Sequence, residues 1–340
     1  MIADVNFLVL WMTNDCNLKC RYCYANGGEK KEYMDFETAK RALEIPKNKF
    51  KLEIAGGEPL LNFQLIRDIH KYLVENKPEI KIQMQTNGAL INRAMAKEIK
   101  EMNIAVGISL DGPIEINEVL RGDTLKVING IKALAYEGVM VNLNCVVTDE
   151  NIRHLEKLVD LAFYLGNIGG IGLDLLRNTG RAINNVKRAN KDDISKYVRK
   201  AYERSIELSK LNGRRIFIRE IEDARKRMKE GKQCLYYCHA ANGGAMVVLP
   251  KGQMYPCGSL INMNQYYMGN IYDEKTSQKN IKIHMNKPNS CGICKYGDIC
   301  TGACPSRSIL NGYDTGVTIE DCALRKVAFN IVEDELIETT

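Results

Sequence analysis

The sequence predicts an α/β protein in which an open, partial barrel of six strand–helix units precedes a small cysteine-rich domain. Apolar runs of strand length alternate with amphipathic runs of helix length up to about residue 185, which is typical of a parallel sheet. Polar motifs follow the strands directly, where parallel barrels carry their functional residues. From about residue 233, cysteines, glycines and short strands dominate the chain.

Each barrel element is predicted from its hydrophobic pattern and its flanking residues. The first strand is the branched apolar run that ends at Trp11, and Asp35 is expected to cap the first helix. Six units, rather than the eight of a closed barrel, indicate that the sheet stays open. The expected strands are 5–11, 51–55, 80–85, 104–110, 139–147 and 170–176, and the helices between them begin near 35, 62, 93, 124 and 150.

The chain is predicted to fall into three segments. Residues 1–185 form the partial barrel, and residues 186–232 form a polar helical bridge with apolar side chains on one face. Residues 233–340 form the cysteine-rich α+β domain, because the composition changes there.

Composition excludes several classes of protein. The 340 residues carry a net charge of +6, and the basic residues are dispersed without a stripe of stacking aromatics, so we expect no nucleic-acid binding. No apolar run is long enough to span a bilayer, and no export signal is visible. The twelve cysteines are therefore expected in a reducing cytoplasm, as metal ligands rather than disulfides.

Three thiols lie close together directly after the first strand, in the spacing Cys16-x3-Cys20-x2-Cys23. Thiolates suit iron–sulfur clusters, zinc and cuprous copper. A closed zinc site or a closed cubane takes four ligands. Three ligands on a four-iron cubane leave one iron open, which favours chemistry at that iron. A zinc site or a group of free thiols is the alternative.

This stretch resembles the signature of the radical SAM superfamily, including the aromatic Tyr22 before the last cysteine. In that family the open iron of a 4Fe–4S cluster chelates the amino and carboxylate groups of S-adenosylmethionine. An electron from the cluster cleaves the sulfonium, and the resulting 5′-deoxyadenosyl radical abstracts hydrogen from the substrate. The resemblance implies a partial (β/α)6 TIM-like barrel of the radical SAM type.

Further motifs at strand ends match positions that line the cofactor site in this family. The resemblance assigns Glu58, in Gly-Gly-Glu-Pro, to the methionine amino group, although an isolated motif of this kind is also common in ordinary loops. Arg121 is either the partner of the methionine carboxylate or a surface arginine, and Leu175 either contacts adenine or packs in the core. The cofactor-binding residues implied are Tyr22, Gly56, Gly57, Glu58, Asn87, Ser109, Asp111, Arg121 and Leu175.

Seven cysteines between residues 238 and 322 resemble the SPASM extension of radical SAM enzymes, which holds two auxiliary 4Fe–4S clusters. A zinc ribbon would explain four of the seven. The resemblance implies three 4Fe–4S clusters in all, together with S-adenosylmethionine. By position, the outer auxiliary cluster would take Cys291, Cys294, Cys300 and Cys322, and the inner one Cys238, Cys257 and Cys304.

The sequence does not assign a fourth ligand to the inner cluster. Cys234 is one helical turn upstream and is our candidate, with a catalytic acid or a plain thiol as alternatives. Without it, the inner cluster has an open iron that could bind a substrate thiolate. Cys145 lies among apolar residues and is interpreted as a core side chain.

The leading functional hypothesis is a peptide or protein maturase that forms a crosslink by net two-electron oxidation. A formylglycine-generating enzyme is disfavoured, because the sulfatase-maturing branch carries an aspartate where this chain has Gly258. The expected partners are a peptide or protein substrate and a reductant such as ferredoxin or flavodoxin. A separate leader-binding protein is a further possibility, since little chain precedes Cys16. The alternatives are oxidation of a porphyrin side chain, as in haem-pathway relatives, and a non-catalytic electron carrier.

Overall fold

In the computed structural model, which describes residues 5–231, 236–273, 281–283 and 285–338, one curved sheet of ten strands runs through the whole chain. The strand order is β10-β9-β8-β1-β2-β3-β4-β5-β6-β7. Neighbouring strands from β8 through β7 are parallel, and β8, β9 and β10 pair antiparallel. The strands are β1 (Phe7–Trp11), β2 (Lys51–Ala55), β3 (Ile82–Thr86), β4 (Ala105–Ser109), β5 (Val141–Val147), β6 (Ile168–Leu175), β7 (Phe217–Ile218), β8 (Ala245–Val248), β9 (Gln253–Tyr255) and β10 (Gly269–Asn270).

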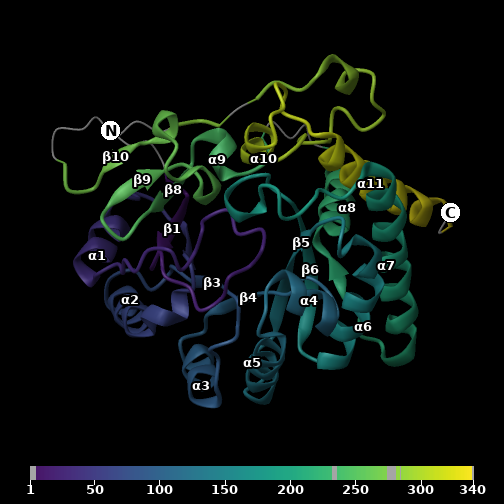
Figure 1. The fold of residues 1–340 in the computed structure, drawn as a ribbon. Coiled ribbons are helices and arrows are strands. Elements are labelled where there is room, and N and C mark those ends of the chain that lie inside the picture. The colour runs from purple at the N-terminus through teal and green to yellow at the C-terminus, as the bar shows by residue number, and fades with distance from the viewer. Residues whose placement is uncertain (1–4, 232–235, 274–280, 284, 339–340) are drawn as a thin grey trace.

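Helices alternate with the parallel strands and cover the outer face of the curved sheet (Figure 1). Asp35 caps α1 by accepting a hydrogen bond from the Thr38 amide at 2.7 Å, as expected. The helices are α1 (Phe36–Glu44), α2 (Phe63–Asn76), α3 (Arg93–Glu101), α4 (Ile114–Leu120), α5 (Thr124–Tyr136), α6 (Leu155–Leu165), α7 (Lys191–Asn212), α8 (Arg219–Glu230), α9 (His239–Asn242), α10 (Pro305–Leu310) and α11 (Ile319–Glu338).

The predicted partial barrel is therefore confirmed, with two elements added. The strand β7 interrupts the expected helical bridge and pairs with β6, and α4 forms a short extra turn after β4. A two-residue strand and a seven-residue helix are too short to show a recognisable hydrophobic period in the sequence.

The cysteine-rich segment is not separated from the barrel by a break in the sheet. Its strand β8 pairs directly with β1, with Phe7 opposite Ala245 and Leu10 opposite Val248. From there the chain crosses the upper edge of the barrel to α11, which packs on α7 and α8 (Figure 1). The boundaries at residues 185 and 232 stay predictions. None of the described helices combines the length and the apolar character needed to cross a membrane.

Candidate functional site

The loop after β1 holds the first three cysteines, and its backbone already points donors at their sulfurs. The Leu18 amide donates to Cys16 Sγ at 3.5 Å, and the Gly27 amide donates to Cys23 Sγ at 3.4 Å. Burial, together with the charges of Glu58 and the neighbouring cysteines, raises the pKa of Cys16 to about 11. Three crowded thiolates therefore need a cationic group among them, and the donor set fits an iron–sulfur cluster.

Two glycines at the end of β2 clamp this loop. A Cβ atom on Gly57 would lie 2.0 Å from the Asp15 carbonyl oxygen, and one on Gly56, whose φ is +149°, would lie 2.7 Å from the Thr13 oxygen. The Gly57 amide donates to the Thr13 oxygen at 2.8 Å. Both glycines line the cavity described below, but the close approach that requires them is to the protein's own loop.

Glu58 lies behind the cavity wall and is fully buried. Its carboxylate accepts from Thr86 Oγ1 at 2.6 Å, from the Asn87 amide at 2.8 Å and from the Leu60 amide at 3.1 Å. In this structure Glu58 thus joins the ends of β2 and β3, and its pairing with an ammonium group stays a prediction.

Tyr22, Asp111 and Arg121 form one hydrogen-bonded group beside the cysteines. The Tyr22 hydroxyl donates to Asp111 Oδ2 and accepts from Arg121 Nη1, and Arg121 Nη1 lies 3.7 Å from Asp111 Oδ2. Asp111 is fully buried and stays off the cavity wall, whereas Arg121 and Tyr22 line it. Arg121 is therefore not a surface arginine. Its Nε atom is buried without a hydrogen-bond partner in the described part of the chain, which fits a carboxylate ligand.

Leu175 does not contact the cavity. Its side chain lies in the main hydrophobic core, and the neighbouring Leu176 lines the cavity instead. Adjacent strand residues face opposite sides of a sheet, so the structure favours the packing interpretation of Leu175 and corrects its proposed contact with adenine.

The barrel interior is polar, and sequence reasoning missed most of its residues. Ser109 and Asn87 line the cavity as expected, with Ser109 Oγ accepting from Gln85 Nε2 at 3.1 Å. Gln85 also binds Asn144 on β5, and Gly107 leaves the space for this contact. Glu53 lines the same cavity. The usable signal was the polar residue at every second position of β2, β3 and β5.

Cys238, Cys257 and Cys304 form a second group of thiols that lines the same cavity. Burial raises the pKa of Cys257, and the charge of Cys304 adds to this effect. Cys234, the suggested fourth ligand, lies outside the described residues. Cys145 is fully buried in the core, where its thiol donates to the Asp111 carbonyl oxygen at 3.7 Å.

The remaining four cysteines line a small separate pocket near the start of α11. The Gly302 amide donates to Cys300 Sγ at 3.4 Å, and Lys287 Nζ donates to the Cys300 carbonyl oxygen at 2.6 Å. The four residues are Cys291, Cys294, Cys300 and Cys322.

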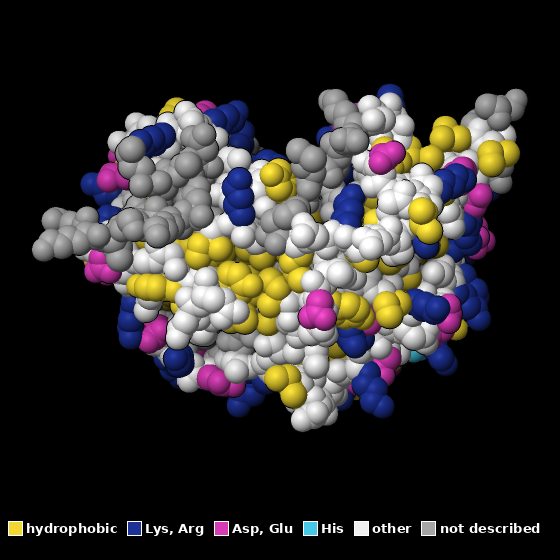
Figure 2. Space-filling view, turned by 90° about the horizontal axis from the view of Figure 1, so that it is seen from above, with side chains coloured by type: hydrophobic (Ala, Val, Ile, Leu, Met, Phe, Trp, Pro, Cys, Tyr) yellow, Lys and Arg dark blue, Asp and Glu magenta, His cyan; other side chains and the backbone are white. Residues whose placement is uncertain are grey.

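One cavity of about 740 Å³ joins the first two cysteine groups. Phe7, Val9 and Val247 give it an apolar side, and the polar barrel interior gives it the other. Seen from above, hydrophobic side chains gather in the middle of the molecule and charged ones lie mainly around the rim (Figure 2). Among the described residues, no three His, Cys, Asp or Glu side chains converge on a point that could hold a single metal ion.

Comparisons with known proteins identify the family of this chain. A profile described as Radical SAM superfamily matches residues 12–162. An uncharacterized protein of Methanocaldococcus jannaschii is 34% identical over 302 residues, which cover 86% of this chain and 96% of the relative. A cysteine-type anaerobic sulfatase-maturating enzyme of Clostridium perfringens is 26% identical over 337 residues, which cover 89% of each chain.

The fold is also that of a solved radical SAM protein. The structure of native anSMEcpe with bound AdoMet and the Cp18Cys peptide has a TM-score of 0.79 and 24% identity, and the match covers 98% of each chain. At this identity the structural match supports the fold, and the sequence matches support the family. This chain therefore belongs to the radical SAM superfamily, whose enzymes use a 4Fe–4S cluster and S-adenosylmethionine.

Proposed function

We propose that this enzyme reductively cleaves S-adenosylmethionine and uses the resulting radical to oxidise a peptide or protein substrate. The product we propose is a crosslink within that substrate. The single observation that carries this proposal is the shared cavity. Cys16, Cys20 and Cys23 line the same cavity of about 740 Å³ as Cys238, Cys257 and Cys304. A substrate in this space would contact both cysteine groups.

The residues at the first cysteine group are suited to hold the cluster and its cofactor. Cys16, Cys20 and Cys23 would bind three irons, and the unpartnered Nε of Arg121 would bind the methionine carboxylate. Tyr22 fixes the orientation of Arg121. When bound, the cluster and S-adenosylmethionine together supply a radical that removes hydrogen from the substrate. The apolar wall of the cavity limits the water that could quench such a radical.

We infer that the inner auxiliary cluster is held by Cys238, Cys257 and Cys304 and accepts the second electron of the oxidation. The outer cluster would be held by the four cysteines near α11. Whether Cys234 closes the inner cluster, or a substrate thiolate does, decides the bond formed. A ferredoxin or flavodoxin is the proposed reductant, and a separate leader-binding protein would explain recognition. All described cysteines are free thiols, as a reducing cytoplasm would keep them.

The substrate differs from that of the sulfatase-maturing relatives. Their branch carries an aspartate directly after the cysteine that corresponds to Cys257, and this chain has Gly258. A Cβ atom on Gly258 would lie 3.0 Å from Trp11 Cζ3 and 3.7 Å from Tyr24 Oη. An aspartate would therefore require Trp11 to move, so another group must accept the substrate proton here.

The porphyrin alternative is less favoured by the charges of the cavity. The propionates of a porphyrin would require cationic partners, and four arginines line the side of the cavity near β6, α8 and α11. They are Arg177, Arg219, Arg227 and Arg325. Each of them, however, already pairs with an acidic side chain within 3.0 Å. An electron carrier is less favoured as well, because it has no use for a large cavity between its clusters.

Anaerobic reconstitution tests the proposal. We expect about twelve iron per chain, and 5′-deoxyadenosine after reduction with dithionite. Cys304→Ala should lower the iron content to about eight, whereas Cys145→Ala, which removes a core thiol, should leave it at about twelve. Incubation with candidate peptides, such as those encoded beside this gene, should give a product lighter by two hydrogens. Zinc in place of iron, or loaded clusters without cleavage in the presence of these peptides, would contradict the proposal.

A further inference from the structure

The side chain of Arg177 reaches the sulfur of Cys304 from the end of β6. Its Nη2 atom lies 3.6 Å from Cys304 Sγ, and its Nη1 atom donates to Asp174 Oδ2 at 2.6 Å. Arg177 lines the cavity, yet its side chain is only 13% exposed. A guanidinium that is held this firmly presents a fixed positive charge to one cysteine of the inner group.

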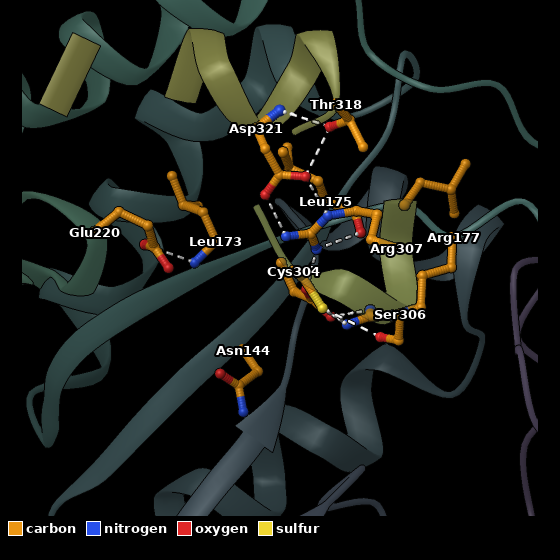
Figure 3. Close-up of polar contacts among 12 residues, drawn as sticks. Asn144, Leu173, Leu175, Arg177, Glu220, Cys304, Ser306, Arg307, Thr318 and Asp321 are labelled. Atoms are coloured by element: carbon orange, nitrogen blue, oxygen red, sulfur yellow. Dashed lines mark hydrogen bonds and ion pairs between the residues drawn. The ribbon is translucent and has the colours of Figure 1, made fainter. Parts of the chain in front are cut away.

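Ser306 offers a second donor to the same sulfur. Its hydroxyl oxygen lies 3.1 Å from Cys304 Sγ, and the residue is 2% exposed (Figure 3). The same hydroxyl also hydrogen-bonds to the neighbouring Cys257. Two donors, one from the loop that follows β6 and one from α10, therefore converge on Cys304.

A chain of ion pairs keeps the arginine in place. Asp174 accepts from Arg177 and also from Arg307 Nη1 at 2.6 Å. Burial alone would raise the pKa of Asp174, but the two arginines lower it below its usual range, so the carboxylate stays charged. Arg307 is in turn bound to Asp321 (Figure 3).

We propose that Arg177 and Ser306 are positioning residues that raise the reduction potential of the inner auxiliary cluster through hydrogen bonds to the Cys304 sulfur. This inference rests on the proposed function, in which Cys304 is a ligand of that cluster. Reduction adds negative charge to a cluster and its thiolates, so a donor or a cation at the sulfur stabilises the reduced state. A higher potential would make this cluster a better acceptor for an electron that leaves the substrate.

A potentiometric titration followed by electron paramagnetic resonance tests this inference. Replacement of Cys16, Cys20 and Cys23 by alanine in the full chain removes the signal of the barrel cluster. In that triple variant we expect Arg177→Gln to make the reduction of one of the two auxiliary clusters about tenfold less favourable. Its reduction potential should then fall by about 59 mV for one electron. Ser306→Ala should shift the same signal in the same direction by less, and Arg177→Lys should shift it less than Arg177→Gln does.

Arg325→Gln is the matched control. It removes a positive charge from the same cavity, but Arg325 pairs with Asp223 and has no hydrogen bond to a cysteine sulfur among the described residues. If Arg177→Gln and Ser306→Ala shift the potential no further than this control, the inference is wrong. If the Arg177→Gln variant loses iron, the shift in potential of the Ser306→Ala variant alone decides whether the inference holds.

Cys304→Ala in the same background separates this inference from the proposed function. The signal that Arg177→Gln shifts must disappear in that variant. If no signal depends on Cys304, the inner cluster itself is refuted, and the inference is refuted with it. If the signal depends on Cys304 but not on Arg177 or Ser306, only the inference is refuted.

Discussion

Replacement of Arg307 by methionine should strongly destabilise the attachment of the C-terminal segment to the barrel. Arg307 lies on α10 and is 2% exposed. It binds both carboxylate oxygens of Asp321, at 2.8 and 2.7 Å, and donates to the Leu175 carbonyl oxygen on β6 at 3.0 Å. It also binds Asp174 on β6. One side chain therefore ties α10 to the start of α11 and to the end of a barrel strand (Figure 3).

The magnitude follows from what the variant leaves behind. Asp174 keeps Arg177, so its charge stays compensated. Asp321 is 2% exposed. Among the described residues, the Thr318 hydroxyl is the one side-chain donor that its carboxylate keeps in the variant. Removal of one partner from a buried ion pair costs about 3–5 kcal/mol, because the other charge is left buried. Methionine fills a similar volume, so a cavity contributes little to this cost.

Urea unfolding of the cluster-loaded protein, followed by far-ultraviolet circular dichroism, measures this loss. Arg153→Met removes an arginine that is 65% exposed and should change the free energy of unfolding by less than about 1 kcal/mol. The double variant Arg307→Met/Asp321→Leu should recover part of the stability, because no buried charge is then left alone. If Arg307→Met unfolds within about 1 kcal/mol of the wild type, the pair is not an anchor and this reasoning is refuted.

Three further predictions concern single side chains. Burial raises the pKa of Glu53 from 4.5 to about 7, so stability should fall as pH rises through this range. Glu53→Gln should remove that slope and be more stable at pH 8 by about 1–3 kcal/mol, and equal slopes in urea unfolding would contradict this. Cys300→Ser should cost about four iron per chain by iron analysis without abolishing the cluster at Cys16; an unchanged iron content would count against the outer cluster. Gly57→Ala should weaken cluster retention, because its Cβ would overlap the Asp15 carbonyl; retention as in the wild type during anaerobic gel filtration would show that the loop can shift.

Patterns in the sequence were sufficient for the barrel, because each unit repeats a local signal. The helix capped by Asp35 and the helix that begins at Thr124 were expected at the positions where the structure has them. The pairing of β8 with β1 was not expected, since it joins residues more than 200 positions apart and no local pattern encodes such a contact. The strand β7 was missed for a related reason, because two residues form no period.

For the candidate site, motifs located residues better than they explained them. Arg121 was a candidate partner of the methionine carboxylate with a surface arginine as the alternative, and the structure adds the buried, unpartnered Nε that suits it to bind a carboxylate. Arg307 gave no signal at all, because arginine is rarely a core residue and its two carboxylate partners lie on other elements. Gln85 and Asn144 were missed because alternation along a strand shows which residues share a face, but not that this face lines a polar interior.

The glycines at the end of β2 show how the protein's own backbone shapes the site. The sequence suggested that Gly56 and Gly57 make room for a ligand, yet the atoms nearest to them belong to Thr13 and Asp15 of the cysteine loop. The amides of Gly57 and Glu58 donate to these two carbonyl oxygens at 2.8 and 2.9 Å. The loop is thus fixed to β2 by backbone contacts alone. Because the loop backbone is ordered by these contacts, cluster binding has less of its conformational entropy to remove.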